Sequence, residues 1–478
     1  MKLTIEPALA KRIGLAALLL LFATVVQGQT DPGPRAGPSN AGGPAAGLSP
    51  GEEKLFWAGW AKFKEKHSVS GAIEKGSGLG PLFNGNSCAQ CHSQPAAGGA
   101  SSSLNSPQVR RVVFRDQRLA LAREPNPQMT LASLDRLPGK NQTVPSFIVA
   151  DGPILVPRFI HKPDGTPDGE VHDIYTIAGR SDAPGCSLPQ PDFAAEMAAH
   201  NVVFRVPTPA FGAGLVEAIL DDTLVSNLAS TAGLRESLRI GGRFNRSPND
   251  GTISRFGWKA QNKSLLIFAA ESYNVEMGVT NELFPSERGQ TPGCLFNRFP
   301  EDEPGTQPGA ASDLASVAAF MRFLAPPTPS TSTPSELNGE KLFSDIGCAL
   351  CHSKSLQTGP SAFGGMSNLL IRPYSDFALH HMGPGLADHV SQGLASGDEF
   401  RTAPLWGLGQ RIFFLHDGRT TDLLQAISAH GSKGQNCRPD TRSSASEACS
   451  SEANAVILRF LSLSPSQKQD ILNFLRSL

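Results

Sequence analysis

The most apolar stretch of the chain lies near its amino end. Lys2, Lys11 and Arg12 precede an apolar run over residues 13–26, and a small-residue cleavage sequence follows it. The run is shorter than the ~20 residues that a membrane-spanning helix needs. No later stretch of the sequence is long enough either. This pattern predicts a secretory signal peptide over residues 1–28 and export of the mature chain to the periplasm.

Apolar residues recur at helical spacing between residues 312 and 324. The pattern predicts a helix that is capped by Ser312 and packs through one apolar face, formed by Leu314, Val317, Phe320, Met321 and Leu324. A similar apolar segment, residues 473–478, ends the chain. Ser466, which follows Pro465, is the predicted start of this second helix. Each helix closes one half of the chain.

Other segments have no helical period. Residues 142–150 and 202–206 are rich in β-branched and aromatic residues, and we expect short strands or extended loops there. Pro-rich and Gly-rich sequence predicts flexible or extended connections. The predicted organisation is therefore a leader over 29–50, an N-terminal domain over 51–325, a linker over 326–335 and a C-terminal domain over 336–478.

The charge of the chain is balanced. Its 478 residues include 42 basic and 43 acidic side chains, so the formal net charge is −1. Proteins that bind nucleic acid or anionic membranes usually carry a basic surface. The composition therefore favours small molecules or redox proteins as partners and argues against nucleic acid.

Two Cys-x-x-Cys-His motifs carry the clearest chemical signal. Cys88, Cys91 and His92 form the first motif, and the second one is formed by Cys348, Cys351 and His352. In an exported protein each motif is typical of a covalent attachment site for c-type haem, in which the histidine is the proximal iron ligand. A zinc site of four thiolates or a thioredoxin-like redox pair is the alternative. Zinc binding does not require a histidine after each second cysteine.

The two motifs belong to an internal repeat of four ordered pieces. Residues 51–56 match 339–343 before the haem motifs, and residues 209–214 match 404–409 after them. The closing apolar segments form the fourth pair. An opening helix, a haem motif and a closing helix are the parts of a class I cytochrome c. We therefore expect a mainly α fold with two such domains in tandem, the first enlarged by a loop and short-strand insert.

Four cysteines lie outside the haem motifs. Cys437 and Cys449 share a Ser- and Arg-rich loop, so they are the favoured disulfide pair, which leaves Cys186 to pair with Cys294. The periplasm permits disulfides. Free buried thiols are the alternative.

Three further segments resemble the bacterial di-haem cytochrome c peroxidase superfamily, which includes the methylamine-utilisation di-haem enzyme. They are residues 78–84, residues 255–260 and residues 414–419. The resemblance is strongest to the branch labelled di-haem or "thiol" oxidoreductases. A cysteine whose sulfur is held in a thioether cannot exchange disulfides, so the thiol label does not fit the haem cysteines.

The resemblance implies a catalytic group beside the first haem. Trp258 stands where the peroxidases have a tryptophan between the two haems, and Glu276 stands in a Glu-Met-Gly sequence that carries their distal glutamate. A core aromatic and a solvated helix-end carboxylate are the alternative interpretations. No histidine occurs between His92 and His161, although His161 or His172 remains a candidate to reach the first haem.

The resemblance also implies a distal ligand for the second haem. His430 stands where the peroxidases have a methionine, so His352 and His430 together would form a bis-histidine haem of lowered potential. Other candidate ligands lie in or near the segment 379–384, and they are Met382, His380, His381 and His389. A calcium ion lies between the haems in several relatives, but the sequence identifies no ligands for one.

These observations predict a periplasmic di-haem oxidoreductase that reduces a small oxidant such as hydrogen peroxide. Its electrons would come from a periplasmic redox protein or another donor. A non-catalytic electron-transfer cytochrome is the first alternative. A di-haem oxygenase that acts on an apolar substrate is the second.

Overall fold

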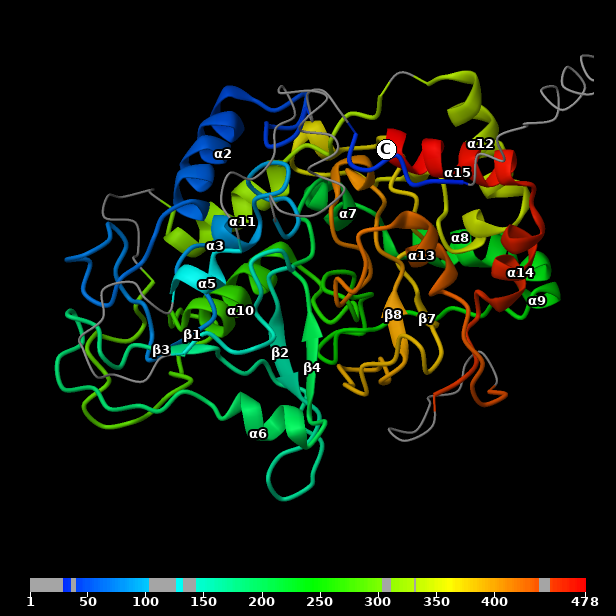
Figure 1. Ribbon diagram of the computed structural model, residues 1–478. Coiled ribbons are helices and arrows are strands. Elements are labelled where there is room, and N and C mark those ends of the chain that lie inside the picture. The colour runs from blue at the N-terminus through cyan, green and yellow to red at the C-terminus, as the bar shows by residue number, and fades with distance from the viewer. Residues whose placement is uncertain are drawn as a thin grey trace, which may run out of the picture.

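The computed structural model describes residues 29–35, 40–102, 126–131, 143–302, 311–330, 332–437 and 448–478. The predicted signal peptide over residues 1–28 lies outside this part of the chain. Most of the regular structure is helical (Figure 1). The α-helices are α2 (Pro50–Phe63), α3 (Cys88–Cys91), α5 (Gln128–Leu131), α6 (Phe193–Ala198), α7 (Ala213–Glu217), α8 (Asp221–Ser230), α9 (Ala232–Ser237), α10 (Leu265–Met277), α11 (Asp313–Phe323), α12 (Pro334–Asp345), α13 (Leu423–Ser428), α14 (Asn454–Ser462) and α15 (Pro465–Ser477).

Short 3-10 helices and small sheets fill the space between the α-helices. The 3-10 helices are η1 (Cys348–Leu350), η2 (Gly364–Met366) and η3 (Leu408–Gln410). Each sheet of the described residues is an antiparallel pair of strands. The pairs are β1 (Leu82–Phe83) with β3 (Tyr175–Thr176), β2 (Val156–Phe159) with β4 (Val202–Arg205), β5 (Leu356–Gln357) with β6 (Leu370–Ile371), and β7 (Leu379–His381) with β8 (Glu399–Arg401).

Strand β4 lies where residues 202–206 predict a strand, and it pairs with β2 in register from Val202 opposite Phe159. The other predicted extended segment, residues 142–150, forms no strand over its described part and contains turns instead. Ile148 is buried in the core, whereas the neighbouring Val149 is half exposed. Without a partner strand, a β-prone segment remains a loop.

Three helices begin with the same capping arrangement. Ser49, Thr333 and Ser464 each accept a hydrogen bond from the backbone three residues on, and a Glu or Gln side chain at that position bonds back to the cap. A proline follows each cap, where its missing N–H costs no helical hydrogen bond. Ser312 caps α11, as predicted. The predicted start at Ser466 is wrong, because Ser464 caps α15 and Ser466 lies in the first turn.

In each half of the molecule an early helix packs across a late one, α2 on α11 and α12 on α15 (Figure 1). The crossings are tight because a glycine lies at each. A Cβ atom at Gly59 would lie 2.1 Å from the Ser316 carbonyl oxygen, and one at Gly339 would lie 2.0 Å from that of Asp470. A larger residue at either position would force the two backbones apart.

These contacts correct the predicted match between residues 51–56 and 339–343. Gly59 is the residue that corresponds in space to Gly339, and Phe63 corresponds to Phe343. Each phenylalanine ring lies 6.0 Å from the histidine of its own haem motif. The sequence match chose an earlier Gly and Phe of the same helix, because helical spacing alone does not show which turn makes the crossing.

The third pair of repeated segments occupies equivalent places in the two halves. Gly212 and Gly407 both adopt left-handed backbone angles, with φ of 68° and 69°. Two residues later, a Cβ atom at Gly214 would collide with the Arg322 carbonyl oxygen of α11. The matching collision at Gly409 is with the Arg476 carbonyl oxygen of α15. Each segment is thus held against the closing helix of its own half.

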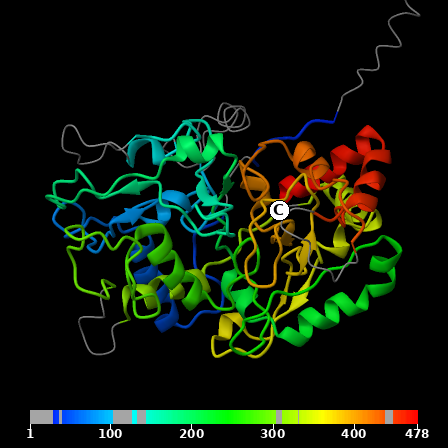
Figure 2. The ribbon, with the colours of Figure 1, turned by 90° about the horizontal axis from the view of Figure 1, so that it is seen from below.

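The buried side chains form two main clusters. The larger cluster surrounds α2, α10 and α11, and the smaller one surrounds α12, α14 and α15. Helices α8 and α9, from the first half of the sequence, lie beneath the half that carries the carboxyl end (Figure 2). Asn227 donates a hydrogen bond to the Ser353 hydroxyl, and Arg235 forms a buried ion pair with Asp376 at 2.7 Å. The two halves of the sequence therefore interlock.

The amino-terminal segment also crosses between the halves. Asp31 is buried, and its carboxylate accepts hydrogen bonds from the Arg476 guanidinium and the Leu423 backbone N–H. This packing differs from the flexible leader that the composition predicts. An ion pair with Arg476 compensates the buried charge of Asp31. The two residues are far apart in the sequence, so no local pattern predicts this pair.

Both predicted disulfides are confirmed: Cys186 is bonded to Cys294 and Cys437 to Cys449. The linker expected over 326–335 ends earlier than predicted, because α12 begins at Pro334. Among the described helices, none has the length and apolar character to cross a bilayer.

Candidate functional site

Two cavities lie beside the two Cys-x-x-Cys-His motifs. The first has a volume of about 160 Å³, and Cys88, Cys91 and His92 line it. Helix α3 is a single turn that contains both cysteines, and His92 is the residue that caps its carboxyl end. The Nδ1–H group of His92 donates a hydrogen bond to the Gly99 carbonyl at 3.1 Å, which makes Nε2 the nitrogen that carries the lone pair. Burial lowers the pKa of His92 to about 4, so the imidazole is neutral, as a metal ligand must be.

The second cavity repeats this arrangement with a volume of about 220 Å³. Cys348, Cys351 and His352 line it, and His352 donates from Nδ1 to the Tyr374 carbonyl at 2.9 Å. Burial lowers the pKa of His352 to about 4, although the Tyr374 hydrogen bond opposes this shift. Both motifs thus present a neutral imidazole with its lone pair on Nε2.

His430 is a second imidazole in the second cavity. Its Nδ1–H group donates to the Ala426 carbonyl at 2.8 Å, one turn back along α13, so its lone pair is also on Nε2. Burial lowers the pKa of His430 as well. His352 and His430 therefore line one cavity in the same tautomer.

The other candidate ligands of the second cavity differ in their surroundings. Met382 lines the cavity, whereas His389 is exposed and lies outside it. His381 is buried, and its Nδ1 is 3.0 Å from the Asp398 carboxylate. His380 lines the cavity, but carboxylates occupy both of its ring nitrogens. Met382 is therefore the one of the four alternatives to His430 that lines this cavity and has a ligand atom, its sulfur, outside these ion pairs.

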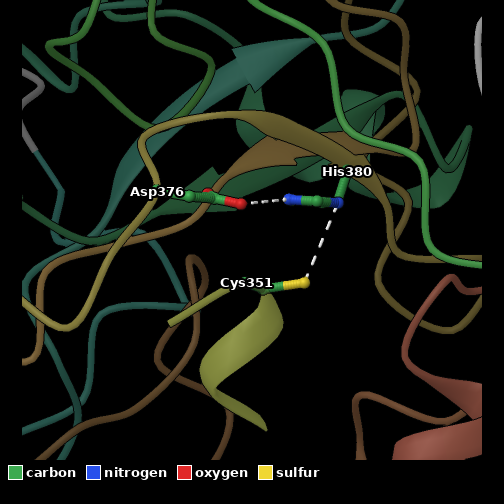
Figure 3. A group of neighbouring side chains, drawn as sticks. All are labelled: Cys351, Asp376 and His380. Carbon is green, nitrogen blue, oxygen red and sulfur yellow. Dashed lines mark hydrogen bonds and ion pairs between the residues drawn. The ribbon is translucent and has the colours of Figure 1, made fainter. Parts of the chain in front are cut away.

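Figure 3 shows His380 between Asp376 and Cys351. The His380 Nε2 atom is 3.0 Å from Asp376, and its Nδ1 atom is 2.6 Å from Glu452 and 3.9 Å from the Cys351 sulfur. Cysteine, histidine and aspartate at these distances resemble a metal site or a nucleophile with its base. A thioether at Cys351 would remove the nucleophile, because its sulfur no longer carries a proton or a charge, and would leave only a weak, neutral metal ligand.

Cys88 and Cys348 are poorly suited to thiol chemistry. Burial raises the pKa of Cys88 to about 12, and the nearby Glu276 carboxylate contributes to the shift. Burial likewise raises the pKa of Cys348 to about 12. Disulfide exchange requires a thiolate, and these thiols stay neutral at physiological pH.

Glu276 lines the first cavity together with His92. It lies at the carboxyl end of α10, where Gly278 ends the helix with φ of 69°. A Cβ atom at Gly80 would collide with the Gly278 carbonyl oxygen, so the segment before the haem motif packs directly on this helix end. Burial raises the pKa of Glu276 to about 7, with a further increase from the Asp173 carboxylate.

Trp258 lines both cavities. Its indole N–H donates a hydrogen bond to the Val206 carbonyl at 2.7 Å, which fixes the ring. The ring centroid lies 6.3 Å from that of His416, and His416 stacks on Phe400 at 4.3 Å. Burial lowers the pKa of His416 to about 4. The sequence placed His416 in a motif but assigned it no position between the cavities.

The remaining polar groups of the first cavity were not predicted. Arg158, Gln261 and Tyr273 each have one buried polar atom without a hydrogen-bond partner, at Nε, Oε1 and OH. Such atoms are rare in folded proteins, and in the wall of a cavity they are available to a bound group. Arg158 suits an acidic substituent such as a haem propionate. The residues of this cavity therefore fit a haem.

Two histidines named as candidates for the first haem lie elsewhere. His161 is exposed, and His172 stacks on Phe159 and bonds to Asp168 at 2.9 Å. Among the described residues, His92 is the only histidine that lines the first cavity. The two cavities thus differ. His92 and the Glu276 carboxylic acid line the first, whereas His352 and His430 line the second together with His380, His416 and Glu452.

Two solved structures are similar to parts of this chain. One is a MauG-like protein associated with microbial copper homeostasis, with 16% identity, a TM-score of 0.28, and coverage of 57% of this chain and 90% of that chain. The other is the hydrazine synthase of Kuenenia stuttgartiensis, with 15% identity, a TM-score of 0.27, and coverage of 57% and 72%. Similarities of this size support no conclusion about fold or activity. A comparison with curated proteins finds no match.

Residues 162–445 match the family described as "Di-haem oxidoreductase, putative peroxidase". Haem is the cofactor of such proteins, and both cavities have the ligands to hold one. The match also agrees with the superfamily that residues 78–84, 255–260 and 414–419 resemble. It spans more than half of the sequence, and the chain therefore belongs to the di-haem oxidoreductase family.

Proposed function

We propose that this protein is an exported di-haem c-type cytochrome that reduces hydrogen peroxide at its first haem and stores electrons at its second. The observation that carries the proposal is the inequality of the two cavities. His92 shares its cavity with Glu276, an acid whose pKa lies near neutrality, whereas His352 shares its cavity with His430. A single protein ligand leaves a coordination position for a substrate, and two protein ligands fill the iron.

Covalent attachment follows from the cysteine pairs. Cys88 and Cys91 would hold one haem by thioethers, and Cys348 and Cys351 the other, with His92 and His352 as proximal ligands. The recurring helix crossings at Gly59 and Gly339 support two class I cytochrome c-like domains, near 51–325 and 336–478. Such attachment takes place in the periplasm, which agrees with the signal peptide proposed for residues 1–28.

Glu276 is proposed as the acid–base group. When bound, the haem iron supplies the electrons that cleave the O–O bond of peroxide. The Glu276 carboxylate accepts a proton from one peroxide oxygen and returns it to the other, which leaves as water. Burial keeps the pKa of this carboxyl near 7, so both protonation states are populated at working pH.

Electrons would reach the first haem through the space that Trp258 occupies. Trp258 borders both cavities, and its hydrogen bond to Val206 holds the ring in one orientation. A periplasmic redox protein is proposed as the electron donor. His430 in place of a methionine favours a donor of low potential.

The test compares three holoproteins in stopped-flow mixing with hydrogen peroxide. We expect Glu276→Gln to react ~100-fold or more slowly than the wild type, because glutamine cannot accept the proton. The wild-type rate should also fall as the pH drops below about 7, where the carboxyl is protonated. Glu271→Gln, on the same helix α10, is the matched control and should keep the wild-type rate.

Low-temperature EPR of the ferric protein tests the inequality of the haems directly. One high-spin signal that changes with peroxide and one low-spin signal are expected. His430→Ala should convert the low-spin signal to a high-spin signal, whereas Met382→Ala should leave the low-spin signal unchanged. Two low-spin haems with no response to peroxide would contradict the proposal and favour a non-catalytic electron carrier, and a stable oxygen complex would favour an oxygenase.

A further inference from the structure

Lys259 follows Trp258 directly and is completely buried. Its ammonium group donates hydrogen bonds to three backbone carbonyls, those of Ser396 at 2.8 Å, Gly397 at 3.2 Å and Glu399 at 2.9 Å. It also forms an ion pair with the Asp388 carboxylate at 3.0 Å. One positive charge therefore gathers four oxygen atoms from a single loop.

This oxygen cage lies between the two cavities. Asp388 also binds the Arg205 guanidinium at 2.6 Å, and Arg205 lines the first cavity. On the other side, the Lys259 ammonium lies 4.0 Å from the centre of the Phe400 ring, which lines the second cavity and stacks on His416. The lysine thus connects the loop to the aromatic side chains that separate the cavities.

The local backbone holds the lysine in place. Ala260, the next residue, adopts a left-handed conformation with φ of 50°, which costs free energy for a residue with a side chain. The Lys259 carbonyl accepts a hydrogen bond from the Asn245 amide at 2.9 Å. The surroundings therefore maintain a strained connection that directs the ammonium into the cage.

Three carbonyl oxygens and a carboxylate are the ligand types that a hard divalent cation prefers. Here the ammonium already occupies their centre, with every oxygen at hydrogen-bonding distance. Arg205 adds a second positive charge beside Asp388. A divalent cation in this cage would be repelled by the positive charges of Lys259 and Arg205, and the Asp388 carboxylate is the one negative charge that these two residues share. A calcium ion of the kind that lies between the haems of several relatives does not fit the residues of this cage.

We propose that the Lys259 ammonium is a built-in cation that takes the place of an inter-haem metal ion. It holds the loop over residues 388–399 against the Trp258, His416 and Phe400 side chains, so this protein needs no calcium to keep its two haem cavities in register. Lys259 is a positioning residue. This inference rests on the proposed function at one point, the assignment of Trp258 to the space between the haems.

The first test uses the wild-type holoprotein. The holoprotein is incubated with one molar equivalent of calcium and then passed through a gel-filtration column. We expect metal analysis of the eluted protein to find far less than one calcium per chain. We also expect EGTA to leave the melting temperature and the ferric EPR spectrum unchanged. Retention of one calcium per chain, with a lower melting temperature in EGTA, would overturn the proposal. Neither readout involves peroxide, so failure of the proposed peroxidase activity leaves this result interpretable.

The second test removes the charge. Lys259→Met should lower the melting temperature by roughly 5 °C or more and shift the EPR signal of at least one haem, because the three carbonyls lose their donor and Asp388 keeps only its ion pair with Arg205. The matched control is Lys263→Met, which removes a lysine that pairs with Asp250 near the surface. Equal behaviour of the two variants would contradict the inference.

Chemical rescue separates charge from volume. Lys259→Ala leaves a buried cavity of the size of the missing aminopropyl group, and n-propylammonium should restore the melting temperature and the EPR spectrum. Its neutral analogue n-propanol should not. Equal rescue by both compounds would mean that the lysine only fills space, and the proposal would then be wrong.

Discussion

Glu287 shows how one buried carboxyl group ties stability to pH. It is 8% exposed, its Oε2 atom has no hydrogen-bond partner, and burial raises its pKa to about 8, with a smaller contribution from Glu301. The folded protein therefore favours the protonated carboxyl. The stability that this group contributes is fully present below its unfolded pKa and is lost as the pH rises through about 8.

We predict that Glu287→Gln stabilises the protein at alkaline pH. Glutamine keeps the shape of the side chain and cannot ionise, so the free energy of unfolding at pH 9 should rise by roughly 1–3 kcal/mol while that at pH 5 changes little. Urea unfolding at both pH values measures the difference. Glu236→Gln, at an exposed position of α9, is the control and should show no such dependence. A loss of stability at pH 9 would contradict the assignment.

The proposed site residues show what local sequence can and cannot predict at this scale. Cys88, Cys91 and His92 are recognisable because they stand in one Cys-x-x-Cys-His motif of five residues. Glu276 becomes distinctive only when α10 brings it to the same cavity and burial raises its pKa. Lys259 has no sequence signal, since its cage consists of three backbone carbonyls and one carboxylate more than a hundred residues away.

At the scale of elements, the helix crossings depend on glycine. The added Cβ atom at Gly59 or Gly339 would meet backbone oxygen atoms, which cannot move without the whole helix. Capping boxes define where α2 and α12 begin, but the crossing points lie well inside each helix. The starts of these helices could therefore be predicted from sequence, whereas the contact turn could not.

We expect Gly59→Ala and Gly339→Ala each to lower the free energy of unfolding by about 1–3 kcal/mol, because overpacking forces the helices apart. Gly51→Ala is the matched control in α2, where a Cβ atom meets nothing within 4 Å. Alanine there should be neutral or slightly stabilising. Urea unfolding of the holoproteins compares the three. A neutral Gly59→Ala variant would mean that α2 and α11 do not cross at this point.

At the scale of the whole molecule, the two halves share their boundary residues. Trp258 comes from the first half of the sequence and lines both cavities, and the Arg401 backbone N–H of β8 donates to its carbonyl at 2.9 Å. Asp31 binds Arg476 from the opposite end of the chain. The space between the haem cavities is thus built from both halves.

Trp258→Phe should slow electron exchange between the haems and leave each haem's ferric spectrum as in the wild type. Phenylalanine keeps an aromatic ring but loses the hydrogen bond to Val206 and part of the contact area. Stopped-flow absorption after partial reduction measures the exchange rate. Trp57→Phe, at a half-exposed ring of α2, is the control. Unchanged exchange would show that Trp258 is only a core aromatic.

Features that depend on neighbouring residues can be predicted from the local sequence. The two haem motifs, the capping of α11 by Ser312 and the short Cys437–Cys449 disulfide all involve spacings of a few residues, which a linear pattern records. The Cys186–Cys294 disulfide followed only because every other cysteine had a partner. Three other contacts depend on the tertiary structure: Glu276 lines the cavity of His92, His430 lines the cavity of His352, and Lys259 lies inside its oxygen cage. These contacts join distant segments, and packing and burial, which no local pattern encodes, select them.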